Sequence, residues 1–198
     1  MLKDSGERRE FESGAVRDIS EGKGRCDLLP LEAIGTHLED NILISIDKYI
    51  RSGDIEFLWF AIEQFSTNHF TDLYTGLLEV SKQYQEGAKK YADRNWEKGM
   101  PVHCYIDSGV RHYLKVLRGD TDEPHDRAFI WNMLGAIWTH TNKPELIDLP
   151  FVDNSKSNSF VHDKKFSDDA LPRLSHFEFG THNHGSVLSI NHKAVPNE

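Results

Sequence analysis

The chain has 198 residues and a formal charge of −9, because 32 Asp and Glu outnumber 23 Lys and Arg. Its 38% hydrophobic residues can form a core, yet no apolar run approaches the ~20 residues that a membrane span needs, so we expect no membrane protein. The acidic balance argues against binding to duplex nucleic acid, which relies on many contacts of Lys and Arg to phosphate. The first residues carry charge and no apolar signal segment, so we expect a cytoplasmic location. Cys26 and Cys104 are too few for a zinc cluster or a disulfide framework and are expected to be thiols.

Both ends of the chain are predicted to be irregular. Residues 1–29 are polar and rich in glycine, with neither helical nor strand periodicity, so we expect an arm that lies near a ligand. Residues 144–198 contain few large apolar side chains, which is typical of an extended tail. The tail holds four histidines in and around the motif THNHG. An irregular or β-hairpin appendage that includes residues 177–190 is favoured there over an HNH-type nuclease site.

The middle of the chain shows five apolar patterns with the three- and four-residue spacing of helices. The predicted helices cover about 30–52, 54–65, 71–91, 102–118 and 123–139. The last of them is apolar nearly all round, which indicates a helix that is central to a bundle or buried between subunits. No strand-like alternation occurs before about residue 174. The sequence therefore predicts an all-α fold with a helical domain over 30–143, an arm over 1–29 and a tail over 144–198.

Polar side chains gather on the last two predicted helices. His103, Asp107 and Arg111 are four residues apart, so they share one helix face, where solvated ion pairs are the plain explanation. A second polar group, at 120–126, begins the last helix, where acidic residues ordinarily complement the helix dipole. Asn132 follows within a long apolar stretch. Because buried polar groups need partners or a ligand, this stretch favours a functional site.

Carboxylates and imidazoles on facing helices can hold a hard divalent ion such as Mg²⁺ or Mn²⁺, and a carboxylate-rich set suits zinc less well. Basic side chains that could neutralise a triphosphate occur in local groups: Lys89, Lys90 and Arg94 near the end of the third helix, Arg111 on the fourth, and Lys23 and Arg25 in the arm. The string EGKGR lacks the Walker pattern and is by itself a turn.

Three segments carry a family resemblance. They are FESGAVRDISEGKGRCDLLP in the arm, QYQEGAKKYADRNWEKG around the end of the third helix, and DSGVRHYLKVLRGDTDEPHDRAFIWN on the last two helices. In these segments the chain resembles the dATP/dGTP diphosphohydrolase domain proteins of phages and bacteria, which are similar to the MazG-like all-α nucleotide pyrophosphatases. The resemblance implies hydrolysis of a purine deoxynucleoside triphosphate to its monophosphate and pyrophosphate, with Mg²⁺ or Mn²⁺, in a homodimer or homotetramer.

On this basis we assign roles to single residues. The expected metal ligands are Glu86, Asp107, Asp122 and Asp126. The expected catalytic residues are Lys90, Arg111, His112 and His125. The expected substrate-binding residues are Lys23, Arg25, Arg94, Asn95, Trp96 and Asn132. The chain departs from the MazG signature, which pairs ExxE with ExxD on the next helix, because only residues 123–126 fit the second half.

Two other hypotheses stay open. One is an HD-type phosphohydrolase whose metal site combines His112, His125, Asp126 and Asp148 and which releases triphosphate or inorganic phosphate. The other is a protein that binds a nucleotide without turnover, which the incomplete MazG signature favours.

Overall fold

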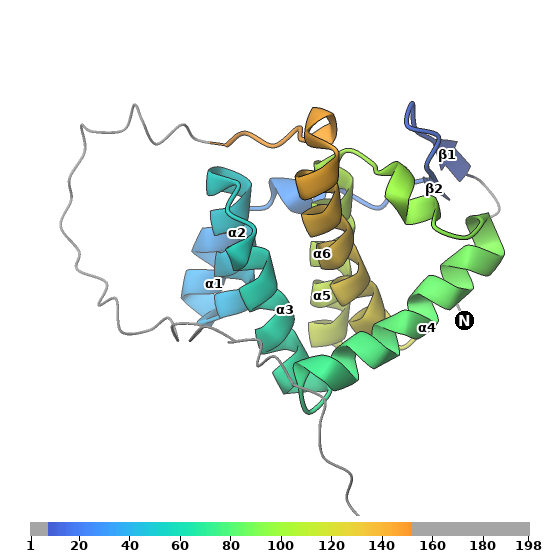
Figure 1. Ribbon diagram of the computed structural model, residues 1–198. Helices are drawn as coiled ribbons and strands as arrows, with labels where there is room; N and C mark the ends of the chain where they lie inside the picture. Colours follow the sequence, from blue (N-terminus) through green and yellow to red (C-terminus); the bar gives the residue numbers. More distant parts are fainter. Residues whose placement is uncertain (1–7, 152–198) are drawn as a thin grey trace, which may run out of the picture. The chain divides into compact units, whose positions relative to one another are not determined.

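Six α-helices make up most of residues 8–151, which are the residues that the computed structural model describes (Figure 1). They are α1 (Leu31–Leu38), α2 (Asn41–Ser52), α3 (Glu56–His69), α4 (Leu73–Tyr91), α5 (Val102–Arg118) and α6 (His125–Asn142). Shorter elements are the strands β1 (Arg8–Glu10) and β2 (Val16–Asp18) and the 3-10 helices η1 (Cys26–Leu28), η2 (Asn95–Lys98) and η3 (Pro144–Leu146). The predicted all-α class is confirmed. None of the described helices combines the length and the apolar composition that a membrane span requires.

The predicted tail falls largely outside the described residues. Only its first part, up to residue 151, is described, and this part contains η3. The appendage expected around 177–190 and the histidines in and around THNHG, which are His176, His182, His184 and His192, lie beyond it.

α5 and α6 lie side by side at the centre of the bundle (Figure 1). Two glycines allow this close approach. A Cβ on Gly109 would lie 2.2 Å from the Cε of Met133, and a Cβ on Gly135 would lie 2.3 Å from Cε1 of Tyr105. α6 also packs on α3 and α4, and its residues Phe129 and Met133 are fully buried. Of the two positions predicted for this apolar helix, the structure has the one at the centre of the bundle.

The single helix predicted over about 30–52 is wrong, because the structure has α1 and α2 there. Glu39 ends α1 in a left-handed conformation, with φ of 57°. The Asp40 carboxylate then accepts hydrogen bonds from the backbone N–H groups of Ile42 and Leu43, at 2.9 and 3.1 Å, and caps α2. The apolar spacing continues across this break, so periodicity alone does not reveal it.

The arm over 1–29, predicted to be irregular, contains a β-hairpin. β1 and β2 pair antiparallel with Arg9 opposite Arg17, and the N–H of Phe11 donates to the carbonyl of Ala15 at 2.9 Å. The expectation of no strand before about residue 174 is therefore wrong. Each strand has only three residues and no apolar alternation, so it leaves no periodic signal. Ala15 is 1% exposed, which shows that the hairpin packs onto the bundle.

The other predicted helices correspond to α3, α4, α5 and α6. α5 has the predicted bounds, and it ends at Gly119 in a left-handed conformation. α4 begins after Asp72, whose carboxylate accepts from the N–H of Thr75 at 2.8 Å. The end of α5 was visible in the sequence because Gly119 sets it locally. The start of α4, predicted at about residue 71, lies two residues later, after its capping residue Asp72.

Candidate functional site

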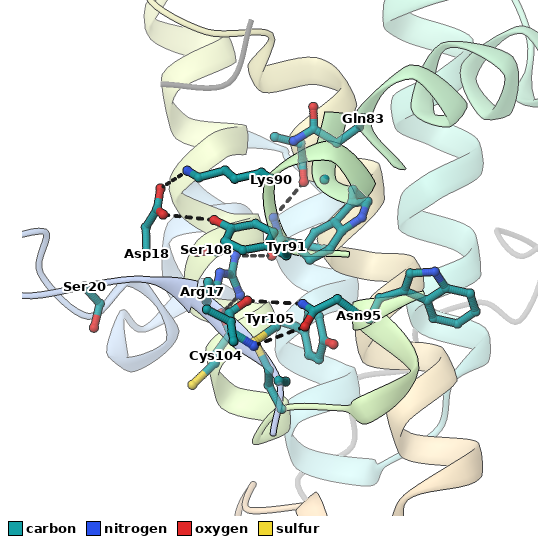
Figure 2. A pocket seen from close by; sticks show the side chains of 18 of the residues that line it. Arg17, Asp18, Ser20, Gln83, Lys90, Tyr91, Asn95, Cys104, Tyr105 and Ser108 are labelled. Carbon is teal, nitrogen blue, oxygen red and sulfur yellow. Dashed lines mark hydrogen bonds and ion pairs between the residues drawn. The ribbon is translucent and has the colours of Figure 1, made fainter. Parts of the chain in front are cut away.

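A cavity of about 950 Å³ lies between the hairpin, the C-terminal half of α4, η2, α5 and the start of α6 (Figure 2). This volume is typical of a small-molecule site. Eight Lys and Arg side chains and five Asp and Glu side chains line the cavity, although the whole chain has a net charge of −9. The basic side chains are Arg9, Arg17, Lys23, Arg25, Lys90, Arg94, Arg111 and Lys115. The cavity thus concentrates positive charge and suits an anionic ligand.

Aromatic side chains form another part of the cavity wall. Tyr84, Trp96 and Trp131 line it. The rings of Trp96 and Tyr84 meet edge to face, with their centroids 5.8 Å apart. Next to Tyr84, the Oε1 atom of Gln83 is buried and has no hydrogen-bond partner within the described part of the chain. Flat rings beside cations suit a ligand that joins an aromatic ring to an anionic group.

Arg17 of β2 provides a buried cation in the cavity wall (Figure 2). Its guanidinium donates to Oδ1 of Asn132 at 2.7 Å and to the carbonyl of Cys104 at 3.2 Å, and it lies over the ring of Trp131. Within residues 8–151, no carboxylate pairs with Arg17. Burial lowers the pKa of Arg17, but an arginine stays charged near neutral pH. A buried cation with neutral partners is a binding point for an anion.

Lys90 and Tyr91, at the end of α4, both contact Asp18 of β2 (Figure 2). The Nζ atom of Lys90 donates to this carboxylate at 2.8 Å and the hydroxyl of Tyr91 donates at 2.9 Å. Asp18 therefore joins the hairpin to α4 and compensates part of the charge of Lys90. Lys23 also lines the cavity, and burial lowers its pKa.

Asn95 holds the outer edge of β2. Its Oδ1 accepts from the N–H of Val16 at 3.3 Å, and its Nδ2 donates to the carbonyl of Val16 at 3.2 Å. The side-chain amide thus takes the place of a neighbouring strand. This contact makes Asn95 a positioning residue for the hairpin.

Asp107 and Arg111 of α5 hold the following part of the arm. One nitrogen of the Arg111 guanidinium donates to both oxygens of Asp107, at 2.6 and 2.5 Å, and to the carbonyl of Gly24 at 2.9 Å. The Asp107 carboxylate also accepts from the N–H of Cys26 at 2.6 Å. Both oxygens of Asp107 are therefore engaged in fixing the arm.

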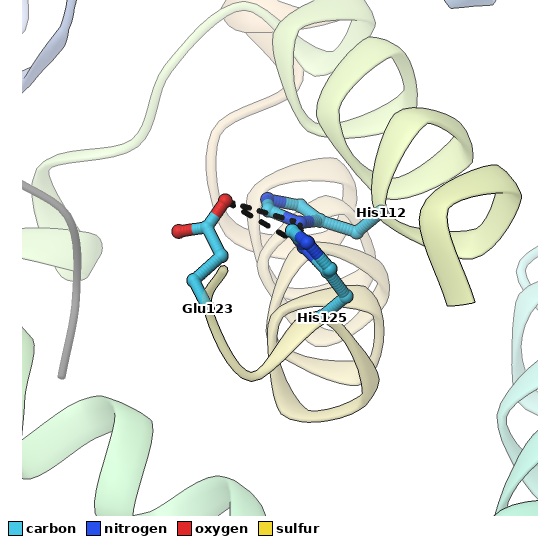
Figure 3. A group of neighbouring side chains, drawn as sticks. All are labelled: His112, Glu123 and His125. Carbon is cyan, nitrogen blue, oxygen red and sulfur yellow. Dashed lines mark hydrogen bonds and ion pairs between the residues drawn. The ribbon is translucent and has the colours of Figure 1, made fainter. Parts of the chain in front are cut away.

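A cluster of two histidines and a carboxylate lies at the junction of α5 and α6 (Figure 3). The Nδ1 atoms of His112 and His125 are 2.9 Å apart, and Oε1 of Glu123 lies 3.8 and 3.6 Å from them. The Nε2 atom of His125 lies 2.8 Å from Oδ1 of Asp122. His112 and Glu123 line the cavity, whereas the His125 side chain is 1% exposed.

Two pKa values in this cluster are displaced. Desolvation, and then the neighbouring His125 and Arg17, lower the pKa of His112 to about 3. The hydrogen bond with His125 lowers the pKa of Asp122 to about 2. Near neutral pH, His112 is therefore a neutral imidazole and Asp122 is a carboxylate.

A cysteine and a histidine, which could in principle form a nucleophile and its base, lie next to each other at the start of α5. Sγ of Cys104 is 3.3 Å from Nε2 of His103 and accepts from Arg9 at 2.9 Å, and His103 pairs with Asp148. Burial raises the pKa of Cys104, so its thiol stays protonated and is a poor nucleophile.

The residues of the HD-type hypothesis are not brought together. Asp148 accepts from the N–H of His103 at 3.0 Å. Asp126 lies near His69 of α3, where its charge partly offsets the lowering of the His69 pKa by burial. Of the side chains in that set, only those of His112 and His125 contact each other.

Most of the predicted site residues line the cavity. These are Lys23, Arg25, Lys90, Arg94, Asn95, Trp96, Asp107, Arg111, His112, Asp122 and Asn132. His125 lies directly behind them, in contact with His112 and Asp122. Glu86 and Asp126 are not among the lining residues.

The four carboxylates predicted to bind metal do not converge. Within residues 8–151, two groups of three His, Cys, Asp or Glu side chains have ligand atoms within 4.8 Å of one another. They are His112, Glu123 and His125, and Asp120, Asp122 and His125. Of the predicted ligands, only Asp122 belongs to either group, so the expected all-carboxylate set for Mg²⁺ does not fit this site.

Arg17, Asp18 and Glu123 are not among the residues with a predicted role. Arg17 and Asp18 lie inside the arm segment that carries the resemblance, but nothing local marks them as buried or paired. Their importance depends on contacts with α4 and α6, which only the fold reveals. For Glu123, the available signal was its place beside His125 in the acidic segment at 120–126.

Comparison with known proteins gives one match. Residues 71–149 match the family model described as dATP/dGTP diphosphohydrolase, N-terminal. This segment is less than half of the chain, and it contains α4, α5 and α6 with the cavity walls that they form, but not the hairpin. No curated protein and no solved structure matches the chain. The match confirms the resemblance for two of the three sequence segments that carry it, those around the end of α4 and on α5 and α6, which are similar to the dATP/dGTP diphosphohydrolase N-terminal family.

Proposed function

We propose that the chain hydrolyses a purine deoxynucleoside triphosphate to its monophosphate and pyrophosphate. The family match supports a dATP/dGTP diphosphohydrolase. The observation that carries the proposal is the positively charged cavity in an acidic chain, with the guanidinium of Arg17 in its wall and no carboxylate beside it within residues 8–151. A triphosphate supplies the negative charge that this wall lacks.

The phosphates have several basic partners in this arrangement. Arg17 and Lys23 bind phosphate oxygens directly, since neither has a carboxylate within salt-bridge distance in the described part of the chain. Stabilising the charge on the transferred and leaving phosphates is the main contribution that a protein makes to such reactions. Lys90 and Arg111, which have carboxylate partners, hold the hairpin and the rest of the arm around the substrate.

The base of the nucleotide fits the aromatic part of the wall. Trp96 and Trp131 offer flat faces, and the buried Oε1 of Gln83 offers a hydrogen-bond acceptor that lacks a partner. Stacking on an aromatic side chain stabilises a bound base by about 1–3 kcal/mol. A purine presents the larger ring surface and gains more from these faces.

The attacking water is oriented on the side of α5 and α6 where His112 lines the cavity. With a pKa of about 3, His112 is a weak proton acceptor near neutral pH, so it orients a group rather than carrying a proton. The divalent ion that the resemblance implies supplies charge neutralisation and lowers the pKa of a bound water.

The organisation of the whole protein is also part of the proposal. The arm over 1–29 and the helical domain over 30–143 act together, since arm residues and helix residues line the same cavity. A cytoplasmic homodimer or homotetramer stays a proposal that rests on the resemblance. The apolar surface of α6 no longer argues for it, because the chain itself buries Phe129, Ile130 and Met133.

The test is incubation of the purified full chain with each dNTP and Mg²⁺ or Mn²⁺, with products separated by ion-exchange chromatography. We expect dATP or dGTP to give the monophosphate and pyrophosphate. Release of nucleoside and triphosphate would support an HD-type reaction instead. Binding without turnover would leave a nucleotide-binding protein.

A pair of variants shows whether the cavity performs the reaction. Arg17→Gln removes the buried cation and is expected to abolish turnover at low substrate concentration. Arg51→Gln is the control, because Arg51 lies on α2, pairs with Asp47 and does not line the cavity. Equal activity of the two variants would place the reaction elsewhere.

A further inference from the structure

Three atoms that can act as metal ligands lie close together at the junction of α5 and α6 (Figure 3). They are Nδ1 of His112, Nδ1 of His125 and Oε1 of Glu123. The two nitrogens are 2.9 Å apart, and Oε1 lies 3.6 Å from the nitrogen of His125 and 3.8 Å from that of His112. Two nitrogens that share one ion at bond lengths of about 2.0–2.1 Å lie about 2.9–3.4 Å apart at right or tetrahedral angles. The two imidazoles already have this spacing, and Glu123 needs to move by only a few tenths of an ångström.

The hydrogen bond to Asp122 determines which ring nitrogen of His125 is available to a metal ion. An ionised carboxylate only accepts hydrogen bonds, so Nε2 of His125 donates to Oδ1 of Asp122, at 2.8 Å. In the tautomer with its proton on Nε2, the imidazole has its lone pair on Nδ1, the atom that lies next to Nδ1 of His112 and Oε1 of Glu123. A carboxylate that holds the outer N–H of an imidazole is the usual support of a metal-binding histidine.

The carboxylate of Glu123, beside these two imidazoles, makes no hydrogen bond within the described residues. Its carboxylate lies beyond hydrogen-bond distance of both imidazole nitrogens, and no other hydrogen bond to it occurs within residues 8–151. Its side chain is only 18% exposed. The negative charges of Glu123 and Asp122 together match a divalent cation.

The geometry points to a divalent transition-metal site formed by His112, His125 and Glu123, with Asp122 orienting His125. Two imidazoles and one carboxylate suit Mn²⁺, Zn²⁺ or Fe²⁺, whereas Mg²⁺ prefers oxygen ligands throughout. His112 and Glu123 line the cavity, so an ion held by them would be accessible to a molecule bound in the cavity. As the metal site of the hydrolysis, this inference rests on the proposed function. As a binding site, it stands on the geometry.

The neighbouring group of Asp120, Asp122 and His125 is a weaker choice. Arg118 donates to both oxygens of Asp120, so this carboxylate already has a cation. Asp122 and His125 are joined to each other by their own hydrogen bond. This group therefore supports the site from behind and does not compete with it.

The test measures metal binding by the full chain without nucleotide. Protein stripped with a chelator is titrated with Mn²⁺, and free Mn²⁺ is followed by its electron paramagnetic resonance signal. We expect one Mn²⁺ per chain, and we expect an equal concentration of Mg²⁺ not to displace it. Displacement by equimolar Mg²⁺ would overturn the choice of a transition metal.

Substitutions then locate the site. Glu123→Gln keeps the shape of a partly exposed side chain and removes the ligand charge, so it tests the site without emptying the buried position of His125. We expect this variant and His112→Asn to weaken Mn²⁺ binding by roughly tenfold or more, and Asp122→Asn by roughly 10–100-fold. Glu86→Gln and Asp126→Asn, at the carboxylates that do not converge, are expected to bind Mn²⁺ like the parent chain.

The outcomes also separate the site from the reaction. Mn²⁺ binding that Glu123→Gln leaves unchanged, or that Glu86→Gln abolishes in a folded protein, would overturn the site. If Glu123→Gln loses Mn²⁺ but hydrolyses dNTPs at the parent rate, the reaction stands and the link of this site to it fails. If the parent binds Mn²⁺ as expected but hydrolyses no dNTP, the site is supported and the proposed function fails.

Discussion

Arg17 shows how a single buried charge can serve binding at the expense of folding. Its guanidinium sits in the cavity wall with an amide and a carbonyl as hydrogen-bond partners. Removing a cation from water is costly unless an opposite charge compensates for it. A bound phosphate would provide that charge, so the free protein holds an arrangement whose stabilising partner is the ligand.

Replacing Arg17 by Gln is therefore expected to affect binding and stability in opposite directions. Affinity for inorganic pyrophosphate should fall by roughly tenfold or more, the effect of losing a hydrogen bond to a charged group. The melting temperature of the ligand-free protein should stay the same or rise. Calorimetric titration and thermal unfolding measure the two quantities, with Arg51→Gln as the control. A variant that melts at a lower temperature but binds pyrophosphate like the parent chain would show that Arg17 has a structural role only.

His112 makes the ligand-free protein sensitive to acid. Its folded pKa of about 3 lies below the ordinary value of about 6.5, so between these values the unfolded chain binds a proton that the folded chain does not. With a chelator present, the contribution of His112 to the unfolding free energy should be constant well above pH 6.5 and fall as the pH decreases toward 3. The slope reaches at most about 1.4 kcal/mol per pH unit for one proton.

The variant His112→Asn isolates this contribution, because His69 and His140 also have pKa values lowered by burial and act in the same direction. Denaturant unfolding at several pH values should show a smaller loss of stability for the variant between pH 7 and pH 5. Parallel curves for the two proteins would mean that His112 takes up its proton without cost in the folded state.

At the scale of single elements, α2 depends on a capping residue that also contacts another helix. The Asp40 carboxylate caps α2 through the N–H groups of Ile42 and Leu43, and its other oxygen accepts from the hydroxyl of Tyr113 on α5 at 2.6 Å. It therefore sets the turn between α1 and α2 and joins that turn to the core helix.

Asp40→Ala should destabilise the protein by about 2 kcal/mol or more, since it removes a helix cap and a hydrogen bond to a buried tyrosine. Asp72→Ala, which removes the exposed cap of α4, should cost less, because the hydrogen bonds of the Asp72 carboxylate go to Thr71 and Thr75, which are close to it in the chain. Chemical denaturation of both variants makes the comparison. Equal losses would show that the bond to Tyr113 contributes nothing.

The hairpin depends on one side chain for its outer edge. In Asn95→Ala both bonds to Val16 are lost, so the amide of Val16 should exchange its hydrogen faster while amides in α5 and α6 keep their protection. The KM for the nucleotide should rise because Arg17 follows Val16 in β2. Asn142→Ala is the control, since Asn142 donates to Trp138 at the end of α6 and does not line the cavity. Unchanged exchange at Val16 would mean that the hairpin stays in place without Asn95.

The sequence allowed prediction of elements and contacts that depend on nearby residues. α5 was predicted with its bounds because its apolar spacing and Gly119 lie within the helix and its cap. The hairpin was missed because its strands are short and their partners are distant. The contact of Arg17 with Asn132 spans 115 residues, so no local pattern contains it. The cluster of His112, Glu123 and His125 was partly visible in the segment 120–126, but the fold decides that Glu123, which precedes α6, lies beside the imidazoles and Asp126, in the first turn of α6, does not.

At the scale of the whole molecule, charge is separated between the cavity and the remaining surface. The cavity carries eight basic and five acidic side chains, whereas the chain as a whole carries a charge of −9. A small anion can reach the positive potential inside the cavity, but the phosphates of a duplex meet the acidic surface first. The protein is therefore expected to select for small polyanions by charge and by size.

Salt dependence tests this separation. The dissociation constant for pyrophosphate should rise roughly tenfold between about 0.05 and about 0.5 M NaCl, because salt screens the cations that face the open side of the cavity. Lys23→Gln should weaken binding and flatten this dependence, whereas Lys48→Gln, on α2 and outside the cavity, should change neither. Duplex DNA should not compete at any of these salt concentrations. Competition by duplex DNA, or salt-independent binding of pyrophosphate, would mean that the anion is held at a surface other than this cavity.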